Sequence, residues 1–564
     1  MKTTAIALCL SLICGSTFAQ NAASQQQKTD TTLLFGSTRV TLPKVAEPVF
    51  RKDTLSIIDF GAVSDGNTLN TKSINDAILQ ANKRGGGVVL IPRGIWLTGP
   101  VELKSNVNLH IASGALLLFT KDFDQYKMVE TNWEGLTAVR NQSPISGVDL
   151  ENIAITGKGV VDGNGDAWRM VKKDKLSEGQ WQKLIASGGI VNEEKRTWYP
   201  SESSLKGASL KNGGVIAAGK TLNDYQEIKD FLRPNLMVLT RCKKVLIDGP
   251  TFQNSAAWNL HPLMCEDVTV RNVIARNPWY AQNGDGIDVE SCKNVLIENS
   301  VFDVGDDGIC IKSGRDEQGR KRGMPTENLI VNNCTVYAAH GGFVIGSEMS
   351  GGARNICVSN CTFMGTDIGL RFKTTRGRGG LVENIYVKNI TMKDIVGEAI
   401  LFDMYYAAVD PIKLPGEKRT APKTELLPVT EATPQFRNFY IENVVCNGAE
   451  KAIFVRGLPE MNIKNISLNN ITIKAKTGIE LIEAQEISLN NLNISTNSAN
   501  TLTTITNSSN IMFNKLSCNK LITLLFAVEG ERSSNICVTN TDTSVAKSVS
   551  SFSNGADKKS LKLK

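Results

Sequence analysis

Two adjacent aspartates, Asp306 and Asp307, lie between Gly305 and Gly308 and directly precede the alternating apolar pattern of residues 309–312. Side chains along a strand point alternately to its two faces, so two neighbouring acids at the start of a strand are not ordinary surface charge. Paired carboxylates suit acid–base chemistry, because one can donate a proton while the other activates water or attacks. Hydrolysis of a glycosidic bond requires such a pair.

Three further segments repeat the same pattern of glycine followed by alternating apolar residues. The glycines that can be aligned are Gly286, Gly308, Gly342 and Gly369. This alignment stacks Asp285 over Asp307, and it stacks Asp306 over His340. If each segment is one copy of a structural unit, aligned residues lie at the strand spacing of about 4.8 Å. We therefore expect successive copies of the unit to build one polar site.

The strand alternation also predicts which residues of this site face outward. Apolar residues such as Ile309 and Ile311 should point into the core, which sends the opposite positions outward. The outward positions of successive units hold Asp306, Cys310 and Lys312, then His340, then Arg371 and Lys373. Asp285 and Asp307 precede their strands beside a glycine, so alternation does not fix their direction.

The residue types at these positions suggest hydrolysis of an acidic sugar chain. Crowded carboxylates repel one another, which raises at least one pKa and suits an acid that must stay protonated near neutrality. Arg371 and Lys373 would neutralise a sugar carboxylate, and His340 would tune the acid beside it. Each feature alone has an ordinary explanation: a turn or a calcium site for the two acids, a surface histidine, or a solvated cationic face. Their common register favours a functional site.

A repeat of strand-like segments predicts the architecture. Short alternating apolar runs end in an asparagine at positions 272, 299, 333, 360, 389, 443, 470, 491 and 540. A period of this length with strand-type alternation predicts an all-β solenoid of stacked coils. The longer gap after Asn389 implies a large loop, and the gap after Asn491 spans a coil with Lys515 in the asparagine position. Asparagine tolerates left-handed backbone at a bend, and its amide can bond to the next coil, so this column is expected to be structural.

The remaining segments predict the organisation of the chain. Residues 20–48 are polar and are expected to form a linker, and residues 49–545 the solenoid domain. Residues 71–83 have one apolar helical face and are predicted to form a helix that caps the exposed end of the solenoid. The repeat breaks at about 166–233, which is expected to be an insertion containing helix, and residues 546–564 are predicted to form a polar tail.

The first 19 residues are predicted to be a secretory signal peptide. A short basic end is followed by the apolar run 5–15 and by Thr17-Phe18-Ala19, a plausible cleavage site. The run is too short to span a bilayer, and no other stretch could do so. The protein is therefore expected in the periplasm or outside the cell. Cys14 is an alternative as a lipid-anchor cysteine, although the residues before it match that motif poorly.

Net charge bears on the expected binding partners, and the cysteine positions bear on disulfide formation. The net charge of +7 fits either a mild basic excess or attraction to a polyanion, and charge alone does not choose among nucleic acid, an anionic glycan and neither. No Lys/Arg run with interleaved aromatics favours nucleic acid. Twelve cysteines in an exported chain would first suggest disulfides. However, Cys242, Cys265 and Cys292 occupy equivalent repeat positions, so we expect mostly free, buried thiols. A monomer is expected.

Four short motifs resemble those of the glycoside hydrolase family 28 enzymes, the polygalacturonases and their relatives. They are Asn283-Gly284-Asp285, Gly305-Asp306-Asp307, Ala339-His340-Gly341 and Arg371-Phe372-Lys373, in the family's order. Ala339 and Phe372 depart from the family's Gly-His-Gly and Arg-Ile-Lys, and neither departure removes a catalytic group. The resemblance spans about residues 57–540. It implies a right-handed parallel β-helix and an inverting mechanism.

The resemblance also implies roles for individual residues. Asp306 would be the general acid, Asp285 and Asp307 would activate water, and His340 would support the acid. The residues expected to contact substrate are Asn283, Arg371, Lys373 and Tyr406, with Tyr405 as the alternative tyrosine. No metal or other cofactor is expected.

The implied activity is hydrolysis of α-1,4-galacturonosidic bonds in pectin, an anionic plant cell-wall polysaccharide. Residues 376–380 resemble the bacterial and plant branch of the family, and an insertion that walls off one end of the cleft would admit only chain ends, which favours exo action. Alternatives are rhamnogalacturonan or a substituted galacturonan as substrate, a calcium-dependent pectate lyase, or a glycan-binding β-helix without activity.

Overall fold

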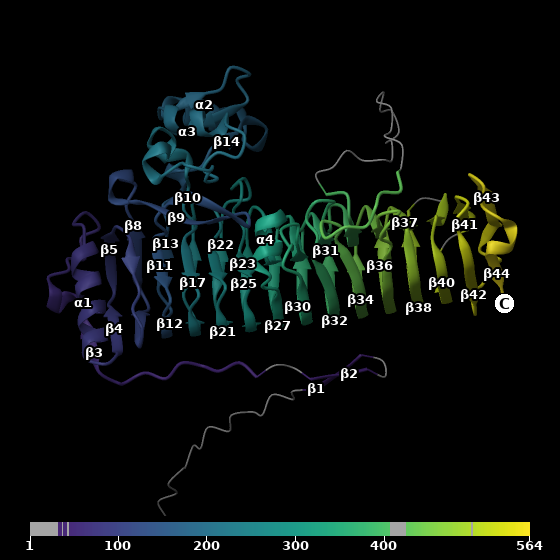
Figure 1. Cartoon of the computed structure of the whole chain (residues 1–564), viewed down its shortest axis with the longest axis horizontal. Coiled ribbons are helices and arrows are strands. Elements are labelled where there is room, and N and C mark those ends of the chain that lie inside the picture. Colours follow the sequence, from purple (N-terminus) through teal and green to yellow (C-terminus); the bar gives the residue numbers. More distant parts are fainter. Residues whose placement is uncertain (1–31, 36–37, 42–43, 407–424, 498–499, 520) are drawn as a thin grey trace, which may run out of the picture.

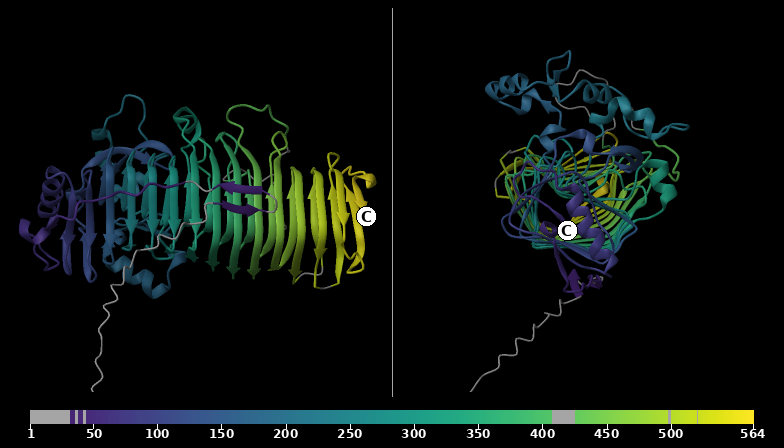
Figure 2. Two further views of the ribbon diagram at one scale, coloured as in Figure 1. Left: turned by 90° about the horizontal axis from the view of Figure 1, so that it is seen from below. Right: turned by 90° about the vertical axis from the view of Figure 1, so that its left-hand side faces the viewer.

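The chain forms a parallel β-helix, as predicted (Figure 1). The computed structural model describes residues 32–35, 38–41, 44–406, 425–497, 500–519 and 521–564. The predicted signal peptide, including Cys14, and much of the predicted linker lie outside these residues. Strands from successive coils pair in parallel and in register, which stacks the coils along one axis (Figure 2).

The two long sheets contain 14 and 23 strands. The 14-stranded sheet is formed by β6 (Val101–Glu102), β11 (Ile145–Val148), β17 (Met237–Thr240), β20 (Leu260–Leu263), β23 (Ile287–Glu290), β26 (Asp307–Lys312), β29 (Gly341–Ile345), β31 (Ile368–Lys373), β33 (Glu398–Asp403), β35 (Lys451–Arg456), β37 (Thr477–Ile482), β39 (Thr501–Thr506), β41 (Ile522–Glu529) and β43 (Ala546–Ser553). The 23-stranded sheet is formed by β3 (Thr54–Ser56), β4 (Gly87–Ile91), β5 (Gly94–Thr98), β7 (Val107–Ile111), β8 (Ala115–Phe119), β12 (Glu151–Gly157), β13 (Val160–Asp162), β18 (Lys243–Asp248), β19 (Thr251–Gln253), β21 (Glu266–Arg271), β22 (Ile274–Arg276), β24 (Lys293–Glu298), β25 (Val301–Asp303), β27 (Thr326–Asn332), β28 (Thr335–Tyr337), β30 (Ala353–Met364), β32 (Leu381–Lys393), β34 (Gln435–Asn447), β36 (Ile463–Ala475), β38 (Ala484–Thr496), β40 (Ser509–Ser517), β42 (Ser534–Thr539) and β44 (Leu561–Leu563).

The core lies inside the coils and is built from the inward residues of each strand. Ile309 and Ile311 of β26, and the equivalent apolar residues of β23, β29 and β31, are completely buried. The strand register is the one that the glycine alignment predicts, because Ile287 pairs with Ile309 and Phe343 pairs with Leu370. The polar residues of the sequence motifs therefore occupy matching places on successive coils.

The asparagine column has the predicted structural role. Its nine members all have left-handed backbone, with φ between 51° and 56°, and Lys515 replaces asparagine with φ of 62°. The side-chain amides of Asn333, Asn389, Asn443, Asn470 and Asn491 each donate to the preceding asparagine of the column at 2.7–3.1 Å. A second column, which we did not predict, contains Asn294, Asn328, Asn355, Asn384, Asn438 and Asn465.

The predicted N-terminal helix is α1 (Thr71–Lys83). Its buried residues are those of the predicted apolar face: Ile74, Ala77, Ile78 and Ala81. It lies at the first coils and contacts β3, β4, β6 and β7 (Figure 1).

The segment predicted as an insertion, 166–233, leaves the solenoid between β13 and β17 and projects from it (Figures 1 and 2). It contains η3 (Gly165–Ala167), β14 (Val171–Lys172), η4 (Lys173–Lys175), α2 (Glu178–Ala186), β15 (Ile190–Val191), β16 (Thr197–Tyr199), α3 (Glu202–Ala208) and η5 (Leu222–Phe231). Val171, Trp181 and Trp198 form its own small apolar core. The antiparallel hairpin of β9 (Met128–Trp133) and β10 (Leu136–Asn141) was not predicted.

Two end segments differ from the sequence prediction. Residues 546–564 do not form a polar tail: β43 pairs with β41, and β44 pairs with β42, which adds a last coil. Partly buried apolar residues explain this, because Val549, Phe552 and Leu561 pack on the core. Within the predicted linker, β1 (Thr32–Phe35) and β2 (Thr38–Thr41) pair antiparallel, and Glu47 forms an ion pair with Arg271 at 2.6 Å.

The prediction of mostly free, buried thiols agrees with eight cysteines that are free and buried: Cys242, Cys265, Cys292, Cys310, Cys334, Cys357, Cys361 and Cys446. Cys242, Cys265 and Cys292 stack on successive coils, and the backbone N–H of Cys265 donates to the sulfur of Cys292 at 3.3 Å. Among the described residues, no helix is long and apolar enough to cross a membrane.

Candidate active site

Three aspartates meet at the starts of two neighbouring strands. Asp307 is the first residue of β26, and Asp285 lies two residues before β23. The two differ from Asp306 in burial: Asp285 and Asp307 are 2% and 1% exposed, whereas the Asp306 side chain is 21% exposed. Asp306 is therefore the acid that a substrate can reach most directly.

His340 stacks on Asp306 from the next coil, as the alignment predicted. Nδ1 of His340 lies 3.1 Å from Oδ1 of Asp306, and the two backbones are joined by an N–H to O bond of 2.9 Å. This side-chain contact raises the pKa of His340 above its usual value, against the opposing effect of burial. On the other side of the ring, Nε2 lies 3.8 Å from Asp367. Asp367 is a neighbour that sequence reasoning missed.

Asp307 is paired with both cations of the fourth motif. Lys373 donates to Oδ2 at 2.8 Å, and Arg371 donates to Oδ1 at 3.3 Å. Burial raises the pKa of Asp307, but the charges of Lys373 and Arg371 outweigh burial and hold this pKa well below its usual range. Asp307 is thus a carboxylate that stays ionised.

Asp285 is the opposite case. Burial, followed by the negative charges of Asp288 and Asp306, raises the pKa of Asp285 well above its usual value. Its Oδ1 has no hydrogen-bond partner among the described residues. The predicted effect of crowded carboxylates is therefore found at Asp285.

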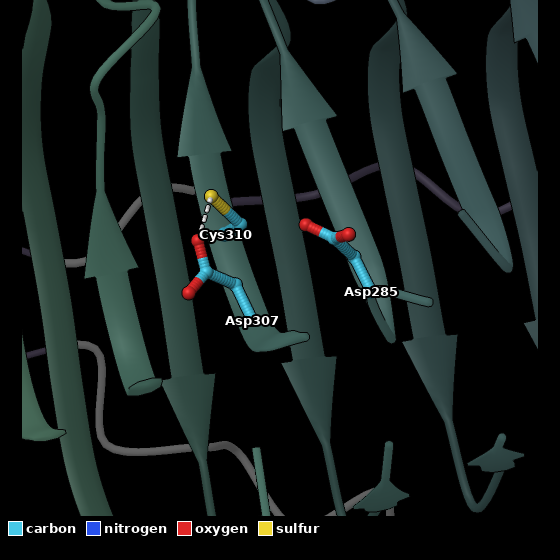
Figure 3. Close-up of side chains that lie close together, drawn as sticks. All are labelled: Asp285, Asp307 and Cys310. Atoms are coloured by element: carbon cyan, nitrogen blue, oxygen red, sulfur yellow. Dashed lines mark hydrogen bonds between the residues drawn. The ribbon is translucent and has the colours of Figure 1, made fainter. Parts of the chain in front are cut away.

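Asp285 and Asp307 lie together with Cys310 (Figure 3). One ligand atom from each lies within 4.8 Å of the others, and the sulfur of Cys310 is 3.7 Å from Oδ2 of Asp307. Oxygens at this separation can share one water with ordinary hydrogen-bond lengths. The donor set suits a cation poorly, because Lys373 already compensates Asp307 and burial raises the pKa of the Cys310 thiol, which keeps it protonated.

A cavity of about 320 Å³ opens beside Asp306 and His340. It is lined by Met170, Lys172, Lys175, Trp279, Tyr280, Gln282, Asn283, Gly305, Asp306, His340, Arg371, Lys373 and Tyr406. Two larger cavities, of about 580 and 570 Å³, are lined by none of the predicted catalytic residues. The smaller cavity is therefore the one of these three that is lined by predicted catalytic and substrate-binding residues.

The cavity distinguishes the two candidate tyrosines. The Tyr406 ring centre lies 4.8 Å from Nζ of Lys373 and 5.7 Å from the Arg371 guanidinium. Tyr405 is 8% exposed and instead contacts Arg376 and Arg456. Tyr406 is thus the tyrosine that faces the site.

Asn283 also lines the cavity, and its orientation depends on a residue that we did not predict. Nη2 of Arg233 donates to Oδ1 of Asn283 at 2.8 Å, and Nη1 donates to the carbonyl of Gln282 at 2.9 Å. Arg233 is the last residue of the segment predicted as an insertion, 166–233, and no local pattern marks it as a partner of this turn.

A buried charged network lies behind the cavity and was also missed. Asp288 is completely buried, its two side-chain oxygens lack hydrogen-bond partners among the described residues, and Lys312 lies 3.6 Å away. Lys312 in turn donates to Glu348 at 3.0 Å. Burial raises the pKa of Asp288 well above its usual value. The signal was present in the sequence, since Asp288 occupies an outward position between Ile287 and Val289.

Comparisons with known proteins agree on one family. The family model described as "Glycosyl hydrolases family 28" matches residues 205–420. The chain is 33% identical to an exopolygalacturonase from Thermotoga maritima of known structure, with a TM-score of 0.61, over 76% of this chain and 89% of that one. It is 27% identical to an exo-poly-alpha-D-galacturonosidase from Dickeya chrysanthemi, over 85% of this chain and 74% of the relative. A probable polygalacturonase from Vitis vinifera is 29% identical over 75% of this chain and 74% of the relative.

Proposed function

The chain belongs to glycosyl hydrolases family 28 and is a glycoside hydrolase, and we propose that it cleaves the α-1,4-galacturonosidic bonds of pectin from chain ends with inversion. This proposal rests on the different positions and burial of the three aspartates. Asp306 faces the cavity beside His340, whereas Asp285 and Asp307 lie behind it, buried and close together.

Asp306 is proposed to be the general acid. It donates a proton to the oxygen of the leaving sugar, and the new negative charge on Asp306 is stabilised by the hydrogen bond from the His340 ring. The pairing with Asp306 raises the pKa of His340, so a protonated ring can donate to the carboxylate that forms once Asp306 has given up its proton.

Asp307 is proposed to be the base that activates water. Since Lys373 and Arg371 keep it ionised, it can accept the proton of a water held between Asp307 and Asp285. Asp285 then orients that water through its unpartnered oxygen. Attack from the side opposite the leaving group forms the product in a single displacement and inverts the anomeric carbon.

The substrate is proposed to be held by its carboxylate. Asn283, Arg371, Lys373 and Tyr406 all line the cavity. Both cations are paired to Asp307 through only part of their donor sets, so they can also bind a uronate. Such a site selects an acidic galacturonan over a neutral glycan.

Chain-end action is supported by the insertion, which contributes Met170, Lys172 and Lys175 to the cavity wall. A wall on one side of the acids leaves less room for a chain to continue there. The exopolygalacturonase and exo-galacturonosidase names of two relatives point the same way.

Product analysis tests this function. The purified protein is incubated with polygalacturonate and, separately, with rhamnogalacturonan, and the early products are sized. We expect monomer or dimer from polygalacturonate alone. Early mixed oligomers would contradict chain-end action. Product release from rhamnogalacturonan alone would show that rhamnogalacturonan, and not polygalacturonate, is the substrate. An unsaturated, ultraviolet-absorbing product would indicate a lyase.

We also propose that the protein is exported and acts as a monomer on the cell-wall polysaccharide. The predicted signal peptide supports export. Cell fractionation tests the location, and radiolabelled fatty-acid incorporation that Cys14→Ser abolishes would show a lipid anchor instead. Light scattering of the purified protein tests the oligomeric state.

A further inference from the structure

Four cationic side chains line the cavity beside Asp306, and they come from two distant regions of the chain. Arg371 and Lys373 lie on β31, which follows the catalytic strands β23 and β26. Lys172 ends β14 and Lys175 ends η4, both in the insertion that leaves the solenoid before those strands. The cavity therefore has a second cationic wall, which none of the four family motifs contains.

The ion pairing of the two insertion lysines differs from that of other nearby cations. Lys173 forms an ion pair with Glu178 at 3.3 Å, and Lys373 is paired with Asp307. Within the described parts of the chain, no carboxylate pairs with Lys172 or Lys175. Two uncompensated ammonium groups beside a cavity create a positive potential that favours an anionic ligand.

Trp279 holds one of these lysines at the cavity. Nζ of Lys175 lies 5.1 Å from the Trp279 ring centre, so the indole attracts the ammonium group without neutralising its charge. Trp279 is also 55% exposed, which is unusual for a large aromatic side chain and leaves surface that a sugar can cover. A cation and an exposed aromatic ring side by side suit a sugar that carries a carboxylate.

We propose that Lys172, Lys175 and Trp279 form a second uronate subsite. It binds the carboxylate of the sugar next to the one held by Arg371 and Lys373. This inference rests on the proposed function, since it assumes a galacturonan chain in the cavity. The consequence is selectivity for at least two consecutive galacturonates with free carboxylates.

A double variant, Lys172→Ala with Lys175→Ala, tests the subsite with two substrates. Trigalacturonate offers adjacent carboxylates, whereas p-nitrophenyl α-D-galacturonide offers only one. We expect the KM for trigalacturonate to rise at least about tenfold, because charge-assisted hydrogen bonds are lost. The KM and kcat for the nitrophenyl substrate should stay within about twofold of the parent values. Lys173→Ala is the matched control, because Lys173 is paired with Glu178 and does not line the cavity. This variant should leave KM and kcat unchanged for both substrates.

The possible outcomes test the proposed subsite and the proposed function independently. Unchanged KM for trigalacturonate in the double variant, or an equal loss on both substrates, would overturn the subsite while leaving hydrolysis intact. If the parent protein cleaves neither substrate, the function fails. Calorimetric binding of trigalacturonate to the parent and double variant then still decides whether these lysines hold the sugar. Replacing both lysines by arginine should preserve binding, which shows that charge and not side-chain volume is responsible.

Discussion

The coils that contain β23, β26 and β31, here called the catalytic coils, and the C-terminal coils that contain β37 and β39 contribute strands to the same sheet. The two groups differ in how deeply their outward residues are buried. In β23, β26 and β31, three outward charged residues are buried: Asp288 is completely buried, and Lys312 and Lys373 are 5% and 6% exposed. Arg371 of β31 is partly exposed. In β37 and β39, the outward residues Glu480 and Thr504 are half-buried. The backbone is the same, and what differs is the cover over the sheet.

This difference in cover accompanies the strong pKa shifts in the coils proposed to be catalytic. The insertion and the β9–β10 hairpin lie over the earlier coils, and α4 (Asp316–Arg322) follows β26 and reaches Glu290 through Arg322 (Figure 1). Covering a charged row removes water, so each charge acts more strongly on its neighbours. The opposite pKa shifts of Asp285 and Asp307 are the result.

The largest effect is expected from removing the proposed proton donor. Asp306→Asn keeps the shape but cannot donate, so kcat on polygalacturonate should fall about 10³-fold while the melting temperature stays near that of the parent. Glu480→Gln in β37 is the control from the C-terminal coils and should leave kcat unchanged. Reducing-sugar release at the parent rate by Asp306→Asn would remove this assignment.

Breaking the ion pair under Asp307 should cost stability as well as activity. Lys373→Met leaves a buried carboxylate with less compensation, and we expect a loss of about 3 kcal/mol in the free energy of unfolding at pH 7. Asp307 has a lowered pKa in the folded protein, so its contribution is present above the ordinary value of 3.8 and is lost as the pH falls through the lowered pKa. The stability difference between parent and variant, from urea unfolding, should therefore shrink below about pH 4.

The C-terminal coils provide the control for this ion pair. Lys451 pairs with Glu480 at a site where both side chains are about one-quarter exposed. Lys451→Met should cost less than about 1 kcal/mol, because solvent screens the pair, and should not change kcat. An equal loss in the two variants would show that the cover over the catalytic coils does not strengthen their charges.

The asparagine column should affect stability alone, with an effect of intermediate size. Asn470 has φ of 56° and bonds to the asparagines before and after it. Asn470→Ala should cost about 1–2 kcal/mol of unfolding free energy, from left-handed backbone and lost hydrogen bonds. Asn470→Gly should cost less, because glycine adopts this backbone freely. A change in kcat for either variant would contradict a purely structural role.

The smallest expected effect is a change in the titration of His340. In the parent, its pKa should lie above the usual 6.5, so the contact with Asp306 stabilises the fold below that value and is lost as the pH rises through the raised pKa. Proton NMR can follow the three histidines, and His340→Gln identifies the relevant signal. Asp306→Asn should lower the His340 midpoint, and an unchanged midpoint would contradict the pairing.

Much of the fold and part of the site could be predicted from local sequence patterns. The register of Asp285 with Asp307 follows from glycine and the two-residue alternation, which are properties of single strands. The last coil was missed because residues 546–564 bury few apolar side chains. Lys172 and Arg233 were missed for a different reason: tertiary packing, not periodicity, decides where a non-repeating insertion meets the solenoid. The same reason applies to the pKa of Asp307, because this pKa is lowered by two cations that come from a different coil.

The most direct test of the account is the anomeric configuration of the first product. Proton NMR of wild-type protein acting on polygalacturonate, recorded before mutarotation, distinguishes α- from β-galacturonate. A water held by the buried pair Asp285 and Asp307 attacks opposite the leaving group, which predicts the β-anomer first. Initial release of the α-anomer would mean retention and would contradict the proposed roles of both aspartates.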